Sequence, residues 1–350
     1  MGQFINRSLK RARAWACCAG LVATPSAFAA PPTGRHEIAR YKLGGDGGWD
    51  YLTVDAAARR LYIARSNRVM VIDADSGALI GEVPSLEGAH GVVTAPELKR
   101  GFATSGRTGE VVAFDLASLK VTGRVKVGEN PDALLLDPFT QKLFAFNGKD
   151  KSATVVDPAT LTVGQTLALG GKPEFAVSDG AGHIYVNIED TSELVVLRVA
   201  KDKPAEIAAR HRLAPCEEPT GLALVPAAKK LLVGCSNRTA VVVDAQTGKV
   251  LQDFKTGDGV DAAAYDATRG FGYISAREGL LTVLKAEHGV FRRVEDVATA
   301  KGSRTLAADP TTGHVFLPAA QFETPPTPPS GQAPRPSVTP GSFFVLVVGK

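Results

Sequence analysis

Six ionisable residues occupy the same position of a repeated sequence pattern. Four of the seven repeats have a carboxylate there, two more have a histidine or an arginine, and the last has Thr220. Carboxylate oxygens suit Ca²⁺ or Mg²⁺, whereas a histidine beside them favours zinc or another transition metal. Brought together by the fold, these side chains would form a divalent-cation site or a polar ligand site. The six are Asp50, His90, Asp132, Glu174, Asp261 and Arg304.

The repeat that positions them extends along most of the chain. Each unit opens on an apolar segment such as PDALLLD or VDAAAYD, and the openings recur every 40 to 46 residues. Three more strand-like segments follow in each unit. A turn sequence such as DPTTG precedes the second, a polar loop precedes the third, and a turn such as DAQTG precedes the fourth. Four short strands joined by such turns predict one antiparallel sheet per unit. The units open near residues 49, 89, 131, 173, 219, 260 and 303.

Seven such sheets predict a ring. One sheet of this size cannot bury both faces alone, but seven bury them by packing around an axis as the blades of a β-propeller. The last unit ends with SFFVLVVGK and lacks a fourth strand, whereas the alternating segment 36–43 precedes the first unit. We therefore predict an all-β, seven-bladed propeller of four-stranded antiparallel blades. Segment 36–43 should pair with 343–348 and complete the last blade.

The strand sequences also carry a family resemblance. LYIARSN, LFAFNGK and IYVNIED, with following segments such as VMVID and ATVVD, resemble the YVTN-type repeat of YncE-like seven-bladed β-propeller proteins, which bacteria export. The resemblance covers nearly all of residues 36–350. It implies a propeller that serves as a binding scaffold, and it implies no particular reaction.

In a propeller, the innermost strands line a central channel and their first residues converge on one face. The six ionisable residues should therefore form a polar funnel, and the loops between second and third strands should add polar side chains to the same face. The alternative is structural: a ring of mixed charges that is solvated or paired within itself. The loop residues are Arg65, Asn67, Arg107, Lys149, Asn187, Asn237 and Arg277.

The N-terminal segment has the layout of a secretory signal. A basic start precedes an apolar stretch that is too short to span a bilayer, and Ala27 and Ala29 offer small residues to a signal peptidase. We predict cleavage after Ala29, with a retained membrane anchor as the alternative. Residues 1–29 are then the signal, and 30–350 form a single propeller domain of a periplasmic or secreted protein.

Cleavage changes the charge balance. The chain has 40 Lys and Arg against 36 Asp and Glu, and segment 1–29 contains four of the basic residues and no acidic one. The mature chain is thus formally neutral, which argues against the basic surface typical of nucleic-acid binding. We expect a monomer that binds a small-molecule or protein ligand on the funnel face, with no nucleic-acid partner and no transmembrane span after cleavage.

Two further features concern the mature chain. Cys216 lies just before the inner strand of the fifth blade and Cys235 at the end of the next strand, which predicts a disulfide in an oxidising compartment. Two free thiols are the alternative. The seventh blade contains a proline-rich insertion, 322–341, which is a lid, a partner-docking arm or a tolerated loop.

Two classes of function fit these features. The first is an exported binding protein or interaction scaffold that uses the polar funnel to hold a ligand or another protein, with no certain cofactor and a divalent cation as the candidate. The second is a divalent-metal-dependent hydrolase, lactonase or lyase with the metal at the channel mouth. The sequence contains no zinc-protease, hydrolase-elbow or calcium-loop motif, which favours the first class. In the second class the metal ligands are Asp50, His90, Asp132, Glu174 and Asp261.

Overall fold

Seven four-stranded antiparallel sheets contain nearly all the regular structure of this protein. The computed structural model describes residues 1–2, 34–323 and 337–350. Nearly all of the predicted signal segment and most of the predicted insertion lie outside these residues. The described chain also has two short 3₁₀ turns, η1 (Pro96–Leu98) and η2 (Pro226–Ala228). No helix in the described ranges has the length and hydropathy needed to cross a membrane.

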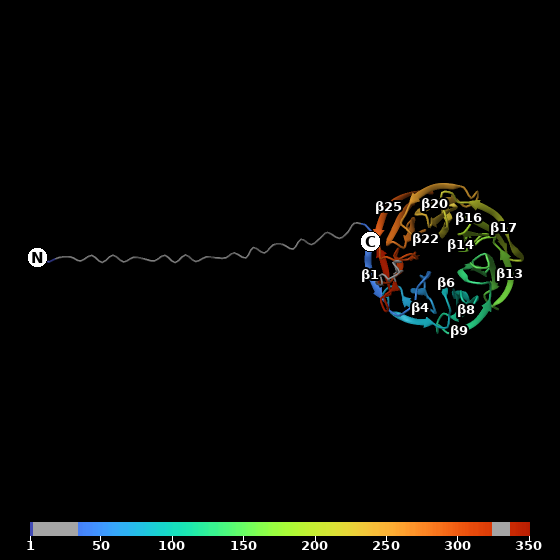
Figure 1. The fold of residues 1–350 in the computed structure, drawn as a ribbon, viewed down its shortest axis with the longest axis horizontal. Coiled ribbons are helices and arrows are strands. Elements are labelled where there is room, and N and C mark those ends of the chain that lie inside the picture. The colour runs from blue at the N-terminus through green and yellow to red at the C-terminus, as the bar shows by residue number, and fades with distance from the viewer. Residues whose placement is uncertain (3–33, 324–336) are drawn as a thin grey trace, which may run out of the picture. The chain divides into compact units, whose positions relative to one another are not determined.

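The strands of each sheet follow one another from the centre of the ring to its rim (Figure 1). The innermost strands are β2 (Leu52–Asp55), β6 (Ala89–Ala95), β10 (Pro131–Asp137), β14 (Pro173–Ser178), β18 (Pro219–Val225), β22 (Val260–Asp266) and β26 (Ala307–Ala308). The second strands are β3 (Arg60–Arg65), β7 (Arg100–Ser105), β11 (Lys142–Asn147), β15 (His183–Ile188), β19 (Lys230–Cys235), β23 (Phe271–Ala276) and β27 (Val315–Ala319).

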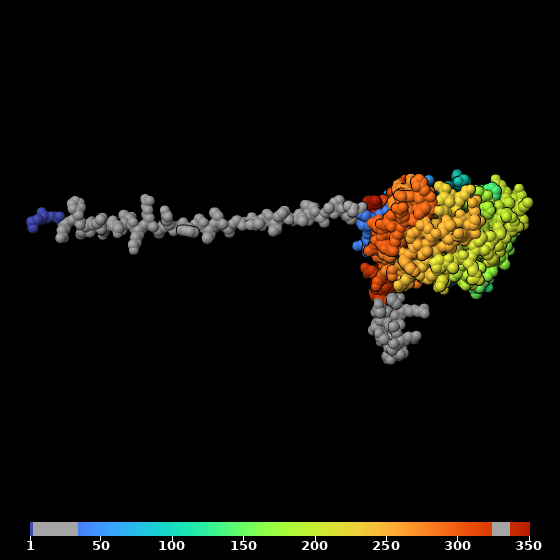
Figure 2. Space-filling view, turned by 90° about the horizontal axis from the view of Figure 1, so that it is seen from above, coloured from blue at the N-terminus to red at the C-terminus, as the bar shows by residue number. Residues whose placement is uncertain are grey.

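The outer half of each blade has the same plan. The third strands are β4 (Arg68–Asp73), β8 (Glu110–Asp115), β12 (Ser152–Asp157), β16 (Glu193–Ala200), β20 (Thr239–Asp244), β24 (Leu280–Glu287) and β30 (Phe344–Gly349). The outermost strands are β5 (Leu79–Val83), β9 (Val121–Lys126), β13 (Thr162–Ala168), β17 (Lys203–Arg212), β21 (Val250–Lys255), β25 (Val290–Ala298) and β1 (His36–Lys42). Figure 2 views the ring edge-on, with the orange surface of the sixth blade next to the yellow surface of the fifth.

The composition of the strands explains this layering. The second and third strands are nearly continuous apolar runs, such as LYIA in β3, and their side chains are buried on both faces of the sheet. The outermost strands alternate, as in β9, where VTGRVK is half-buried and exposed in turn. Apolar clusters therefore fill the gaps between neighbouring blades. One of them joins Tyr62 and Val71 of the first blade to Val92 and Phe114 of the second.

The last blade is completed by the first strand, as predicted. β1 pairs with β30 in antiparallel register, from His36 opposite Gly349 to Lys42 opposite Phe344. β30 in turn pairs with β27, and β27 with the short innermost strand β26. The two ends of the insertion, β28 (Phe322–Glu323) and β29 (Ser337–Val338), pair with each other as a separate two-stranded ladder.

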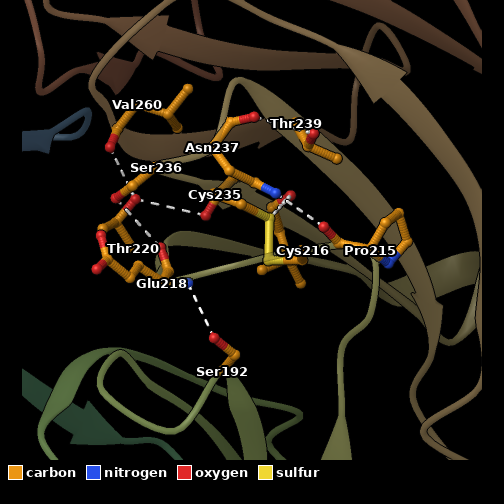
Figure 3. The surroundings of a disulfide bond; sticks show 12 residues. Ser192, Pro215, Cys216, Glu218, Thr220, Cys235, Ser236, Asn237, Thr239 and Val260 are labelled. Atoms are coloured by element: carbon orange, nitrogen blue, oxygen red, sulfur yellow. Dashed lines mark hydrogen bonds between the residues drawn. A yellow bond between two sulfur atoms is a disulfide. The ribbon is translucent and has the colours of Figure 1, made fainter.

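The predicted disulfide is present. Cys216 and Cys235 are bonded, with their Cα atoms 5.5 Å apart (Figure 3). Both residues are buried. Beside the bond, the backbone N–H of Glu218 donates to the hydroxyl of Ser192 at 3.1 Å, which links the fifth blade to the fourth. The bond therefore fixes the segment that enters β18 against the end of β19.

Candidate functional site

The six ionisable residues selected from the repeat lie together around the starts of the innermost strands. Four of them stand second in their strands, while Asp50 and Arg304 stand just before β2 and β26. The four carboxylates are almost fully buried, with no more than 9% of each residue exposed. We call this set the inner-strand cluster: Asp50, His90, Asp132, Glu174, Asp261 and Arg304.

Five members form a continuous chain of contacts across five blades. The Arg304 guanidinium donates to a carboxylate oxygen of Asp261 and, at 3.2 Å, to Oδ1 of Asp50. The other oxygen of Asp50 lies 2.5 Å from Nδ1 of His90. The same nitrogen is 3.7 Å from Oδ1 of Asp132. The cluster is therefore partly paired within itself, and the pairing is weakest at Asp132.

The remaining arc of the ring uses Thr220, which occupies the repeat position, and Lys172, which the repeat did not reveal. Lys172 Nζ lies 3.1 Å from Oε2 of Glu174 and also pairs with Glu189. Lys172 stands two residues before Glu174 in an extended segment, and this i, i+2 spacing on one face is the signal that identifies it. On the next blade the hydroxyl of Thr220 donates to the carbonyl of Val260 at 2.9 Å.

Burial and mutual repulsion raise the pKa values of three carboxyl groups. Burial, reinforced by the negative charge of Asp50, raises the pKa of Asp132 to about 7. Burial and the charge of Asp132 hold the pKa of Glu174 well above its usual value. Burial also raises the pKa of Asp261, although the Arg304 guanidinium opposes the rise. These carboxyl groups therefore retain protons at pH values where a solvated carboxyl is ionised.

The pKa of His90 is also raised, but here because the charged form is stabilised. Burial alone lowers the pKa of His90, but the hydrogen bond to Asp50 and the charges of Asp132 and Asp50 outweigh it, so the pKa rises. His90 and Asp132 are thus neighbouring groups whose pKa values are both raised. A change of one charge on either alters the proton affinity of the other.

Asp132 Oδ1 is a buried acceptor without a hydrogen bond to any described residue. Leaving a buried carboxylate oxygen unpaired is costly, and a cation or an ordered water would satisfy it. Asp50, His90 and Asp132 each offer one ligand atom, and these atoms all lie within 4.8 Å of one another. Glu174 and Asp261, also predicted as ligands, are placed outside this group and are paired with basic side chains.

Next to the cluster, two aromatic rings meet across the ring of blades. Tyr51, from the first blade, packs against Phe175, from the fourth, with ring centroids 4.9 Å apart. The Tyr51 hydroxyl is buried and has no hydrogen-bond partner in the described ranges. Burial and the nearby carboxylates, Glu174 first among them, raise the pKa of Tyr51 well above its usual value.

One loop residue expected on the funnel face is structural instead. Arg65 is fully buried, donates to the carbonyls of Gly47 and Gly48 at 3.1 Å, and stacks on Phe343 at 3.6 Å. The prediction that Arg65 adds a polar group to the funnel face is therefore wrong, because its side chain is fully buried. Asn187 is also buried, and its amide donates to the carbonyl of Gly221 at 3.0 Å.

No family model and no curated protein matches the chain, so membership of the YVTN-type family stays a prediction. Solved structures do match it. A chain of "Kuenenia stuttgartiensis Hydrazine Synthase" is 14% identical with a TM-score of 0.68, over 79% of this chain and 93% of that one. The RRP9 WD40 repeats are 10% identical, with a TM-score of 0.72 over 88% and 96%. U3-55K is 10% identical, with a TM-score of 0.72 over 89% and 99%. At these identities the likeness concerns the fold alone, and with the seven blades observed here it identifies the fold as a seven-bladed β-propeller.

Proposed function

We propose that this protein is an exported binding protein that holds a cation in the funnel formed by the inner-strand cluster. Export rests on the composition of segment 1–29, and the Cys216–Cys235 bond is compatible with an oxidising compartment. The propeller supplies a rigid scaffold on which the side chains of six blades converge. The family expectation of a binding scaffold agrees with this proposal.

The observation that carries the proposal is the unpaired oxygen of Asp132. It is buried, it faces His90 Nδ1 at 3.7 Å, and it belongs to a group of three ligand atoms. Two carboxylates and one imidazole suit a divalent transition metal such as Zn²⁺ better than Ca²⁺, which prefers six or more oxygens. Asp50, His90 and Asp132 would hold the ion, and its charge would offset the repulsion between the carboxylates.

Binding is the function proposed, and it does not extend to catalysis. A hydrolase, lactonase or lyase would also need an acid, a base or a nucleophile placed against a substrate. We assign the funnel a ligand-binding role only, with Arg304 and Lys172 as its basic members.

The experiment is a calorimetric titration of the chelator-treated mature protein with Zn²⁺, Mn²⁺, Mg²⁺ and Ca²⁺. We expect one equivalent of Zn²⁺ or Mn²⁺ to bind, and Asp132→Asn and His90→Gln each to weaken this binding by at least about tenfold. Asp179→Asn is the matched control, because Asp179 also pairs with a histidine, His183, at 2.9 Å, outside the cluster. Equal binding by the Asp132 and Asp179 variants would contradict the proposal. A titration in which none of the four ions binds would also contradict it.

A further inference from the structure

The interfaces between neighbouring blades, which we call seams, differ in how completely side chains fill them. In every blade one residue of the outermost strand pairs with the fourth residue of the third strand and stands at the seam with the next blade. We call it the seam residue. In blade order the seam residues are Gly81, Gly123, Gln165, Ala209, Gln252, Glu295 and Ala39.

Two seams are filled by a leucine from the next blade. A Cβ atom added at Gly81 would meet the side chain of Leu119, and one added at Gly123 would meet Leu161. Each leucine comes from the turn between the third and fourth strands of the following blade. In these seams, glycine leaves space that the leucine occupies.

Three seams are closed by a polar side chain. The side-chain amide of Gln165 makes two hydrogen bonds with the backbone of Ala205 in the next blade, one as donor and one as acceptor, both at 2.8 Å. Gln252 does the same with Phe291, at 3.0 and 2.9 Å. Glu295 accepts a hydrogen bond from the backbone N–H of Arg35 at 2.7 Å. Such side chains span the seam and satisfy backbone groups on its far side.

The seam between the seventh and first blades uses an aromatic ring. The seam residue Ala39 is small, and Tyr41, two residues further along, lies over Gly77 in the turn of the next blade. The Tyr41 hydroxyl donates to the carbonyls of Ala74 and Asp75 at 3.1 and 2.9 Å. The phenol therefore both fills the seam and pairs with its far side.

The seam between the fourth and fifth blades repeats this arrangement with a smaller ring. Ala209 is the seam residue, and His211, again two residues further along, lies over Gly248. No hydrogen bond joins the His211 ring to another residue of the described chain. A cleft of about 630 Å³ remains here, about twice the clefts of 290 and 300 Å³ at the two glutamine-closed seams.

The cleft lies on the face opposite the inner-strand cluster. The turns after the innermost and third strands line it, whereas the cluster stands where the innermost strands start. Its volume falls within the usual range for small-molecule sites, about 300–1,000 Å³. The side chains of Tyr185, Val196 and Leu224 give it an apolar lining, and His183 and His211 add two flat rings.

One unpaired cation stands at the edge of the cleft. Arg198 lines the cleft and is paired with Glu206 at 2.9 Å, whereas Lys229, which also lines it, makes no ion pair with any residue in the described ranges. Asp179, the acidic lining residue, is 2.9 Å from His183 Nδ1. Burial, with the charges of Asp179 and Asp244, raises the pKa of Tyr185 to about 12, so its hydroxyl stays a donor at neutral pH.

From the unfilled seam, its apolar lining and its basic edge, we propose that this cleft is a second binding site, independent of the funnel, for a small planar aromatic anion. The aromatic body packs among Tyr185, Val196 and Leu224, with the histidine rings beside it. The carboxylate or sulfonate faces Lys229. Naphthoate has this chemistry and serves as the probe.

The experiment measures naphthoate binding to the full chain by calorimetry and by NMR of the histidine ring protons, of which the chain has six sets. We expect saturable binding that shifts the His183 and His211 signals. Lys229→Met should weaken naphthoate by at least about tenfold and leave the neutral analogue naphthylmethanol unchanged. Lys120→Met, at an exposed position outside the cleft, is the matched control.

Two further variants should close the cleft with side chains that fill other seams. His211→Tyr introduces the phenol that Tyr41 places in the seam between the seventh and first blades. Ala209→Gln introduces the amide that Gln165 and Gln252 place in theirs. Either variant should abolish binding of both probes while the melting temperature stays equal or rises. If one variant fails to fold, the other decides the question. Full naphthoate binding by a folded, closed variant would overturn the proposal, as would the absence of saturable binding by the parent.

Discussion

The ring of Tyr51 packs on the ring of Phe175, with centroids 4.9 Å apart and planes inclined by 52°, although the two residues start from the first and fourth blades. Neighbouring blades are joined by many side chains, but this contact joins blades that are not neighbours. The centre of the ring is therefore packed at this level with aromatic carbon. The Tyr51 hydroxyl is left in a buried position near four carboxylates.

Tyr51→Phe removes a buried hydroxyl that has no described partner. We expect the free energy of unfolding to stay the same or to rise by up to about 1 kcal/mol, because a desolvated polar group is lost without a broken bond. Tyr41→Phe is the matched control. Its hydroxyl donates to two carbonyls, so its loss should cost about 1 kcal/mol. Urea unfolding of both variants tests this, and an equal loss would show that Tyr51 has a partner such as water or a bound ion.

Asp132→Asn should change how stability depends on pH. The pKa of Asp132 is raised to about 7 from 3.8, so between these values the folded chain binds a proton that the unfolded chain releases. The free energy of unfolding therefore falls as the pH rises through this window, and the raised pKa of His90 acts in the same direction. The variant should be more stable than the parent at pH 8, by on the order of 1–3 kcal/mol, and similar near pH 4.

Urea unfolding of metal-free protein between pH 4 and pH 8 measures this difference. Asp244→Asn is the control, because hydrogen bonds from Thr247 lower the pKa of Asp244. Its contribution is lost only as the pH falls below about 4, so the slope above pH 5 should match that of the parent. An Asp132 variant with the parental slope would contradict the assignment.

Arg304→Ala should be strongly destabilising, because it removes the cation shared by two buried carboxylates, Asp50 and Asp261. Leaving a buried charge unpaired costs about 3–5 kcal/mol. Arg238→Ala breaks the exposed pair with Asp258 and should change the free energy of unfolding little, because water screens this pair. Chemical denaturation of the two variants compares these values. Losses that agree to within 1 kcal/mol would mean that the cluster is hydrated and that its pairing contributes little.

The double variant Cys216→Ala, Cys235→Ala should lower the free energy of unfolding by about 3 kcal/mol in the chain-entropy account, since the bond closes a loop across 19 positions. Reducing agent should destabilise the parent by a similar amount and leave the variant unchanged. Mass spectrometry of unreduced mature protein checks the bond directly. Two alkylatable thiols in that sample would rule it out.

The architecture and most of the site could be predicted from the sequence because the sequence repeats. Aligned units gave the number of blades, and the missing fourth strand after SFFVLVVGK identified β1 as its replacement. Stacking the units also placed the inner-strand cluster, because equivalent positions of a propeller share one distance from the axis. Cys216 and Cys235 followed from their places on paired strands.

Contacts between residues of different blades could not be predicted from the repeat. Which members of the cluster pair depends on the rotation from one blade to the next, so neither the Arg304–Asp261 pair nor the Tyr51–Phe175 contact follows from the repeat. Arg65 was misplaced for a related reason. An arginine before a polar loop suggests a surface residue, but the segment GGDGG at 44–48 turns its carbonyls towards the guanidinium.

The pairing of β1 with β30 gives the folding reaction an order. Within the first six blades, each strand finds its partners within the same unit, and such local pairings form early. The strand His36–Lys42 instead pairs with Phe344–Gly349, which lies at the other end of the propeller sequence. Until those last residues are present, the nascent chain carries an unpaired strand that another copy can complete by exchange. The ring therefore becomes topologically closed only when its final strand has emerged.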